Sequence, residues 1–300
     1  MNSISVTAPA KINMGLEILG LRNDGFHEIR SVIATISLFD TLTFASNAGP
    51  SDQIAIGGVD QDIPREQNLV LLALKALRES GARIPPQHIT LTKRIPVASG
   101  LGGASSDAAA TLRHFAFQLD VPQVEISRIA ATLGSDVPFF LGAPFAIARG
   151  RGDQLTALPP PNIARWVVTV TPDISVSTKT ATMYREINRG RWTSGERVEQ
   201  FAASFPTPPR HLPPNTFARV LFSRFPKTAD NRDKLLRAGF PFVAVTGAGP
   251  TLFTICESEL DAIDFSQRAT AVLPSGIVHA SQVGAAPISS EVKIDRQVGL

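Results

Sequence analysis

The chain has 300 residues, of which 43% are hydrophobic and 18% are charged, and its formal net charge at pH 7 is +3. These values are typical of a globular protein long enough for one large or two medium domains. The small excess of basic residues is not gathered into a dense patch, so no nucleic-acid partner is expected. The only cysteine, Cys256, excludes an intramolecular disulfide and is compatible with a reducing compartment.

No stretch of the sequence contains the ~20 apolar residues that a membrane-spanning helix requires. The nearest approach, 137–148, is interrupted by Pro138 and Pro144. Residues 1–10 lack the basic start and the apolar core of a secretory signal. We therefore expect a soluble, cytoplasmic protein without a membrane partner.

The first elements in chain order are predicted to be strands of an antiparallel meander. Apolar residues alternate over 4–8 and over 12–18, which predicts two strands, or one bent strand kinked at Pro9. The segment 22–25, Arg-Asn-Asp-Gly, predicts a turn. Further strands are expected at 29–38 and 41–44.

Helices then alternate with a strand and a glycine-containing loop. A helix is predicted over 68–80, with Gly81 in the position that commonly ends a helix. The β-branched run 89–95 predicts a strand, and the segment 108–119 carries a helical apolar stripe. A short helix over 124–133 is expected to stop at Gly134.

The second half of the chain has a mixed α+β pattern. Three prolines at 159–161 mark the expected boundary between two domains, 1–160 and 161–300. The segment 205–214 is too rich in proline for regular structure, and the residues from Ala286 onward are expected to fray. Strands are predicted at 166–170, 242–245, 251–256 and 277–280, and helices at 180–188, 215–224, 230–238 and 259–273.

The glycine-containing loop is the first candidate for a binding site. Its glycines lie within 100–103, and Ser105, Ser106 and Asp107 stand where residues that cap a helix N-terminus belong. Such a loop directs unpaired backbone N–H groups and the positive end of the helix dipole to one point, which suits a phosphate. An ordinary turn before a helix would also explain the glycines. The loop has no Walker A lysine, and Ser105 replaces the third glycine of a dinucleotide fingerprint.

Two charged residues outside the loop are candidates for phosphoryl-transfer chemistry. Lys11 interrupts apolar neighbours in a predicted strand, so it either faces solvent or supports an anionic transition state. Asp136 either caps the segment that follows it or accepts the proton of a substrate hydroxyl. Only the fold can bring these two residues together.

Two further segments have both a structural and a functional interpretation. Phe26 is either a core residue or a stacking platform, and the adjacent His27 could bond to the edge of a base. The second glycine loop, 246–250, is either a hairpin turn or a backbone contact to phosphate or substrate.

The motif Pro-x-x-x-Gly-Leu-Gly-x-x-Ser-Ser-x-Ala-Ala, which begins at Pro96, resembles the ATP-phosphate loop of the GHMP kinase superfamily. The superfamily phosphorylates small alcohols such as galactose, homoserine and mevalonate. The segments 9–13, 22–29, 134–140 and 247–253 resemble, in the same order, motifs of one of its families, the kinases of 4-diphosphocytidyl-2-C-methyl-D-erythritol. Residues 176–178 and Asn215 also fall where that family has them.

This resemblance implies a fold and a set of site residues. The implied fold is α+β with two domains, an N-terminal ribosomal-protein-S5-domain-2-like α/β domain and a C-terminal ferredoxin-like α+β domain. Lys11 and Asp136 are implied as the catalytic pair. The implied ATP site consists of Asn68, Pro96, Val97, Ala98, Ser99, Gly100, Leu101, Gly102, Gly103, Ala104, Ser105 and Ser106. The implied substrate contacts are Asn13, Phe26, His27, Thr180, Tyr184 and Gly247.

In that family the cytidine ring lies between two aromatic side chains, which match Phe26 and Tyr184. Phe26 stands where tyrosine is usual. Stacking requires only the face of the ring, so we expect the change to weaken a polar contact without altering the class of substrate.

The implied function is transfer of the ATP γ-phosphate to the substrate 2-hydroxyl, which gives the 2-phosphate in the non-mevalonate pathway to isoprenoid precursors. Mg²⁺ is expected to offset the nucleotide charge, with Ser106 considered as its ligand. A mevalonate, phosphomevalonate or homoserine kinase would share the loop but leave the Phe26–His27 pair unexplained. A non-catalytic sensor would be expected to lose Lys11 or Asp136. The expected partners are ATP and the cytidylated substrate, and the expected assembly is a monomer or a homodimer.

Overall fold

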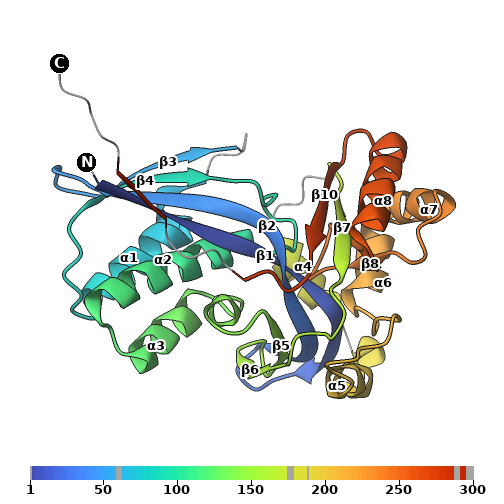
Figure 1. Ribbon diagram of the computed structural model, residues 1–300. Helices are drawn as coiled ribbons and strands as arrows, with labels where there is room; N and C mark the ends of the chain where they lie inside the picture. Colours follow the sequence, from blue (N-terminus) through green and yellow to red (C-terminus); the bar gives the residue numbers. More distant parts are fainter. Residues whose placement is uncertain (1, 59–62, 174–178, 188, 287–290, 295–300) are drawn as a thin grey trace.

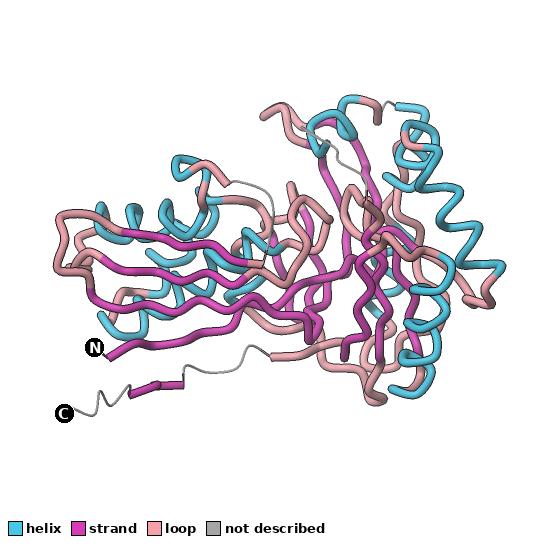
Figure 2. Tube along the Cα trace, turned by 90° about the horizontal axis from the view of Figure 1, so that it is seen from above, coloured by secondary structure: helices cyan, strands magenta, loops and turns pink. Residues whose placement is uncertain are grey.

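Two β-sheets organise the chain in the computed structural model, which describes residues 2–58, 63–173, 179–187, 189–286 and 291–294 (Figure 1). The larger sheet has seven strands and the smaller has four. Figure 2 shows the two sheets side by side, each with its own helices. Within the described residues, no helix is long and apolar enough to cross a membrane.

Two long antiparallel strands, β1 (Asn2–Leu21) and β2 (His27–Ser46), form the centre of the larger sheet. The expected kink at Pro9 is a register shift between Pro9 and Ala10, inside one continuous strand. The two strands predicted at 29–38 and 41–44 are likewise parts of β2. The turn predicted between β1 and β2 is confirmed, with Gly25 at a positive φ.

Shorter strands extend this sheet on both sides of β1 and β2. β4 (Gln87–Thr92) pairs with β2, and β3 (Gln53–Gly57) adds to β4 in parallel. β5 (Phe145–Arg149) also pairs with β2 and forms a hairpin with β6 (Gln154–Ala157). Strands β3, β5 and β6 were not predicted.

Three helices pack against the larger sheet and bury its apolar face: α1 (Leu69–Glu79), α2 (Gly103–Leu119) and α3 (Gln123–Leu133). Helix α2 begins five residues before the predicted start, because Gly102 adopts a left-handed conformation, with φ 75°, and takes the N-cap position. Ser105, Ser106 and Asp107 therefore lie inside the helix, and the prediction that they are N-caps is wrong.

The smaller sheet has the order β10-β7-β9-β8, with all pairs antiparallel. Its strands are β7 (Trp166–Thr171), β8 (Ala244–Val245), β9 (Leu252–Cys256) and β10 (Ile277–Gln282). Three helices pack with this sheet: α6 (Phe217–Arg224), α7 (Pro226–Arg237) and α8 (Glu259–Val272). The predicted strand at 242–245 is confirmed only for its last two residues.

Two more helices lie where the halves of the chain meet: α4 (Lys179–Arg185) and the unpredicted α5 (Glu196–Ala203). The described residues also form three short 3-10 helices: η1 (Arg65–Gln67), η2 (Pro138–Leu141) and η3 (Arg189–Arg191).

The end of the chain returns to the first sheet. Residues 291–294 form β11 (Glu291–Ile294), which pairs antiparallel with β1, so the prediction that the chain frays from Ala286 is wrong for this segment (Figure 2). The division into domains 1–160 and 161–300 stays a prediction.

Candidate active site

A cleft of about 1420 Å³ lies where the two halves of the chain meet, and it gathers most of the predicted site residues. The first half contributes β1, the turn before β2, the start of α1, the glycine loop and the turn after α3. The second half contributes α4, the start of α6 and the second glycine loop. Among the residues that line the cleft are Lys11, Asn13, Phe26, His27, Asn68, Pro96, Val97, Ala98, Ser99, Gly100, Gly102, Gly103, Ala104, Ser105, Asp136, Tyr184 and Gly247.

The two glycine loops pack directly against each other. Gly100 has φ +89°, and a Cβ atom at this position would lie 2.5 Å from the carbonyl oxygen of Thr246. The Thr246 hydroxyl donates to the Gly100 carbonyl at 3.3 Å, and Thr251 N–H donates to the Ser99 carbonyl at 3.2 Å. The second loop therefore supports the first from behind.

The supported loop leads into the N-terminus of α2. The first N–H groups of a helix have no partner within the helix. In α2 these groups belong to Gly103, Ala104 and Ser105, and all three residues line the cleft. Backbone N–H groups and the positive helix end thus meet at one place, where a phosphate would be stabilised.

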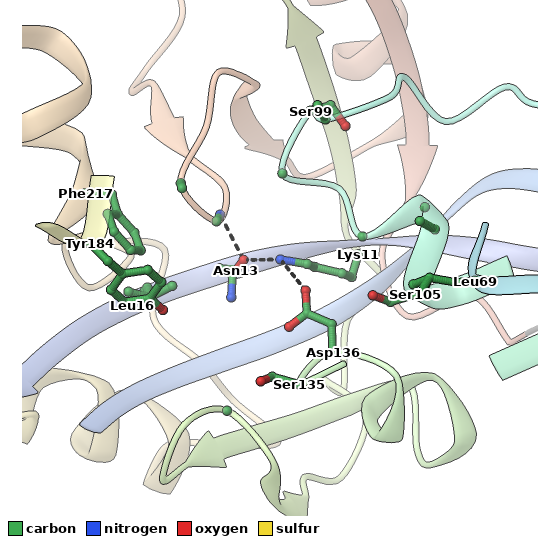
Figure 3. A pocket seen from close by; sticks show the side chains of 18 of the residues that line it. Lys11, Asn13, Leu16, Leu69, Ser99, Ser105, Ser135, Asp136, Tyr184 and Phe217 are labelled. Atoms are coloured by element: carbon green, nitrogen blue, oxygen red, sulfur yellow. Dashed lines mark hydrogen bonds and ion pairs between the residues drawn. The ribbon is translucent and has the colours of Figure 1, made fainter. Parts of the chain in front are cut away.

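Lys11 and Asp136 come together beside this helix end, although 125 positions separate them in the sequence. The Lys11 Nζ lies 3.7 Å from Asp136 Oδ2 (Figure 3). Lys11 is 4% exposed, so the alternative of a solvent-facing lysine is wrong. Asp136 lies in the turn between α3 and η2, and its side chain is 41% exposed to the cleft. It is not an N-cap, since Val137 takes that position for η2.

Asn13 connects Lys11 to the second glycine loop. Its Oδ1 accepts hydrogen bonds from Lys11 Nζ at 2.6 Å and from Gly247 N–H at 2.9 Å. Its amide nitrogen donates to Ser31 Oγ at 2.8 Å, which fixes the orientation of the amide. Asn13 therefore positions Lys11, and its predicted contact with the substrate stays a prediction.

An aromatic group lines the opposite end of the cleft. The rings of His27 and Tyr184 stack with centroids 4.9 Å apart, and Tyr184 meets Phe217 edge-on. Burial raises the pKa of Tyr184 to about 12, and the charge of Asp136 adds to the shift. Burial also lowers the pKa of His27, so its imidazole is neutral at pH 7.

Phe26 also lines the cleft and is 49% exposed. In this structure the His27 ring, and not a base, stacks on Tyr184. The enclosure of a base between Phe26 and Tyr184 stays a prediction. Thr180 belongs to α4, but its side chain is outside the described residues, as is the predicted motif at 176–178.

The end of the cleft away from the aromatic group, beyond the glycine loop, has apolar walls formed by residues such as Leu69, Val70 and Leu91. Asn68, predicted to contact ATP, is the N-cap of α1 and lines the cleft there. Its side-chain oxygen accepts from Val70 N–H at 3.0 Å. This arrangement offers a flat apolar group a place to bind next to the phosphate loop.

A buried group of three ionisable side chains, Lys93, Asp40 and Asp107, lies behind the loop and was not predicted from the sequence. Lys93 Nζ donates to Asp40 Oδ2 and to Asp107 Oδ2, the latter at 2.7 Å. Burial raises the pKa of Asp107 to about 7, with the charge of Asp40 adding to the shift and that of Lys93 opposing it. Burial alone would lower the pKa of Lys93, but the two carboxylates outweigh it and the pKa is raised. The group ties α2 to β2 and to the end of β4.

The expected metal has no evident side-chain ligand set. Within the described residues, no group of three or more His, Cys, Asp or Glu side chains could hold an ion. Ser106, considered as a ligand, is fully buried, and its hydroxyl has no hydrogen-bond partner in the part of the chain that the structure describes. The neighbouring Ser105 lines the cleft instead.

Comparison with known proteins adds independent information about the chain. Residues 68–143 match the model of the GHMP kinases N terminal domain. A Dehalococcoides mccartyi protein described as 4-diphosphocytidyl-2-C-methyl-D-erythritol kinase is 36% identical, over 85% of this chain and 90% of its own length. A Chlorobaculum tepidum protein of the same description is also 36% identical, over 90% of this chain and 95% of its own.

Solved structures agree with these relatives. A crystal structure of 4-(cytidine 5'-diphospho)-2C-methyl-D-erythritol kinase superposes with a TM-score of 0.73 at 31% identity, covering 94% of this chain and 99% of that one. A homoserine kinase from Cytophaga hutchinsonii has a TM-score of 0.69 at 20% identity, covering 98% of each chain. The second likeness shows the fold alone.

Proposed function

The chain belongs to the 4-diphosphocytidyl-2-C-methyl-D-erythritol kinase family of the GHMP kinase superfamily, and we propose that it phosphorylates the 2-hydroxyl of that compound with ATP. It is an ATP-dependent small-molecule kinase with the two-domain α+β fold of the superfamily. The product is the 2-phosphate, an intermediate of the non-mevalonate pathway to isoprenoid precursors.

The observation that carries the proposal is the position of Lys11 and Asp136 at the N-terminus of α2. A substrate hydroxyl beside Asp136 gives its proton to the carboxylate as its oxygen attacks the γ-phosphorus. The bond from this phosphorus to the bridging oxygen of ADP breaks, and ADP leaves. The Lys11 ammonium group, 3.7 Å from the carboxylate, offsets the negative charge that develops on the transferred group.

The loop and the end of α2 bind the nucleotide in this proposal. The N–H groups of residues 103–105 bind phosphate oxygens, and the apolar wall near Asn68 binds the base. Mg²⁺ bound with the nucleotide would lower the negative charge of the phosphates. Because Ser106 is buried, its hydroxyl is not placed to hold the ion.

The aromatic end of the cleft binds the cytidine. Phe26 and Tyr184 provide the ring faces, which requires His27 to move off Tyr184 when the base enters. The neutral imidazole of His27 then has one donor and one acceptor for the edge of the base. This geometry gives the Phe26–His27 pair a role that a mevalonate or homoserine kinase would not need.

The proposal retains a cytoplasmic location and a monomeric or homodimeric state, which fractionation and sedimentation would test. Turnover is tested by following ADP release with the cytidylated methylerythritol, mevalonate, phosphomevalonate and homoserine. We expect turnover only with the first compound. Preferred turnover of any other would show that the proposed substrate is wrong, and ADP release that no acceptor increases would contradict a kinase.

A further inference from the structure

Arg151 lies at the tip of the β5–β6 hairpin, on the wall of the cleft. The glycines on either side of it both have positive φ, +67° at Gly150 and +103° at Gly152. The Gly150 carbonyl accepts from Ile29 N–H at 2.8 Å, which holds the tip against the first residues of β2. Arg151 is therefore presented from a turn that is bonded to Ile29, the second residue after His27.

The guanidinium group of Arg151 has three neighbours, one of which is the Ala131 carbonyl, which accepts from its Nη2 at 3.4 Å. Its Nε forms an ion pair with Asp153 Oδ2 at 2.7 Å, and its central carbon lies 5.1 Å from the centroid of the Phe26 ring. A cation over an aromatic face is attracted by the ring quadrupole. The side chain stays 30% exposed, and no partner of its Nη1 is found among the described residues. It thus has hydrogen-bond donors available to a ligand.

The hairpin tip also approaches residues of both β2 and the turn that holds Asp136. A Cβ atom at Gly152 would lie 3.4 Å from Ile29 and 3.9 Å from Ser135. Ile29 is the second residue after His27, and Ser135 immediately precedes Asp136. The tip that carries Arg151 is therefore close to residues next to both the Phe26–His27 pair and Asp136.

Few other positively charged side chains in the cleft are free to bind an anionic part of the substrate. The described residues that line it include four cations, Lys11, Lys93, Arg151 and Arg185. Lys11 binds Asn13 and faces Asp136, while Lys93 is enclosed by two carboxylates. Arg185 is exposed and donates to Thr182 within its own helix. Of these four described cations, only Arg151 is both held by an ion pair and placed over the ring of Phe26.

We propose that Arg151 binds the diphosphate that joins the nucleoside to the phosphorylated alcohol, and thereby selects nucleoside-diphosphate-linked substrates. The inference rests on the proposed function, which supplies the diphosphate. A guanidinium group presents planar, paired N–H donors that match phosphate oxygens, so the interaction is directional as well as electrostatic. Its position over Phe26 allows one residue to contact the base platform and the diphosphate together.

The test compares Arg151→Gln with Arg149→Gln. Arg149 is two residues away in the same hairpin but pairs with Glu199 and does not line the cleft. The probes are CDP and cytidine, each titrated calorimetrically into the folded proteins. A charge-assisted hydrogen bond contributes about 1.5–3 kcal/mol, which corresponds to roughly ten- to hundredfold in affinity.

We expect Arg151→Gln to lower the affinity for CDP by roughly ten- to hundredfold, while the affinity for cytidine changes by less than about threefold. The KM for the cytidylated substrate should rise with the CDP dissociation constant, and the KM for ATP should stay constant. Arg149→Gln should bind both probes like the wild type. Arg151→Lys, which keeps the charge but not the planar donors, should fall between the wild type and Arg151→Gln.

Several outcomes would overturn the inference. If Arg151→Gln lowered the affinities for CDP and cytidine equally, Arg151 would only support Phe26. If the affinity for CDP were unchanged, Arg151 would not bind the diphosphate. In both cases the wild type still binds CDP and the proposed function stands. If the wild type binds neither probe, the proposed function fails and the inference fails with it.

Discussion

The contact between the two glycine loops predicts a specific effect of Gly100→Ala. An alanine at φ +89° costs about 1–2 kcal/mol because its Cβ crowds the following carbonyl oxygen. Its Cβ would also lie 2.5 Å from the Thr246 carbonyl and 3.0 Å from the Gly249 carbonyl. These are backbone atoms that cannot rotate away, so overpacking adds about 1–3 kcal/mol. The loops must separate, and the N-terminus of α2 loses its support.

Gly81→Ala is the matched control. Gly81 has φ +100°, but a Cβ atom there would meet nothing within 4 Å. We expect urea unfolding to show a loss of about 1–2 kcal/mol for Gly81→Ala and of about 2–5 kcal/mol for Gly100→Ala. The KM for ATP should rise only in Gly100→Ala. Equal stabilities and equal KM values in the two variants would refute a rigid contact between the loops.

The remaining predictions concern side chains. His27→Ala should raise the KM for the cytidylated substrate by about tenfold or more and leave the KM for ATP unchanged, because only the substrate base loses a hydrogen bond; equal effects on both would contradict the assignment. Lys11→Met should lower kcat by about 10²–10³-fold, the effect of removing one donor to a transition-state charge, and an unchanged kcat would exclude that role. The pKa of Asp107 is about 7 in the folded protein and 3.8 ordinarily. Between these two pH values the folded state therefore binds a proton that the unfolded state has lost. Stability should therefore fall from pH 4 to pH 7 more steeply in the wild type than in Asp107→Asn, and denaturant titrations with parallel slopes would exclude this titration.

Local patterns in the sequence predicted much of the fold, because they report short-range geometry. The alternation in 4–18 predicted β1, and Gly81 marked the end of the helix before it. The pattern could not show that Pro9 causes only a shift in register within a strand that continues. It also missed the start of α2, which depends on the left-handed conformation of Gly102 rather than on the helix-forming residues that follow.

Elements stabilised by distant partners were beyond the reach of local patterns. Helix α5 has an N-terminus that is capped from β1, where Glu17 accepts a hydrogen bond from Val198 N–H at 2.9 Å. β11 depends on pairing with β1 at the opposite end of the chain. Neither partner can be identified from the residues of the element itself.

The candidate site shows the same contrast between local motifs and distant contacts. The glycine loop and the Phe26–His27 pair were visible as motifs, since each is a short run of unusual residues. The Lys93–Asp40–Asp107 group was not, because Asp40 lies 53 positions from Lys93 and Asp107 looked like a helix cap. The contact of Asn13 with the substrate stays a prediction, and the sequence could not show that its amide group is engaged by Lys11, Ser31 and the second glycine loop.

The most direct test of the account is the turnover of Asp136→Ala, measured beside its affinity for ATP. We expect kcat to fall by about 10²–10⁴-fold, since the substrate hydroxyl loses its proton acceptor. The dissociation constant for ATP should stay within a few-fold of the wild type, because the loop and α2 that bind it are untouched. A variant that binds ATP normally and turns over at the wild-type rate would contradict the account.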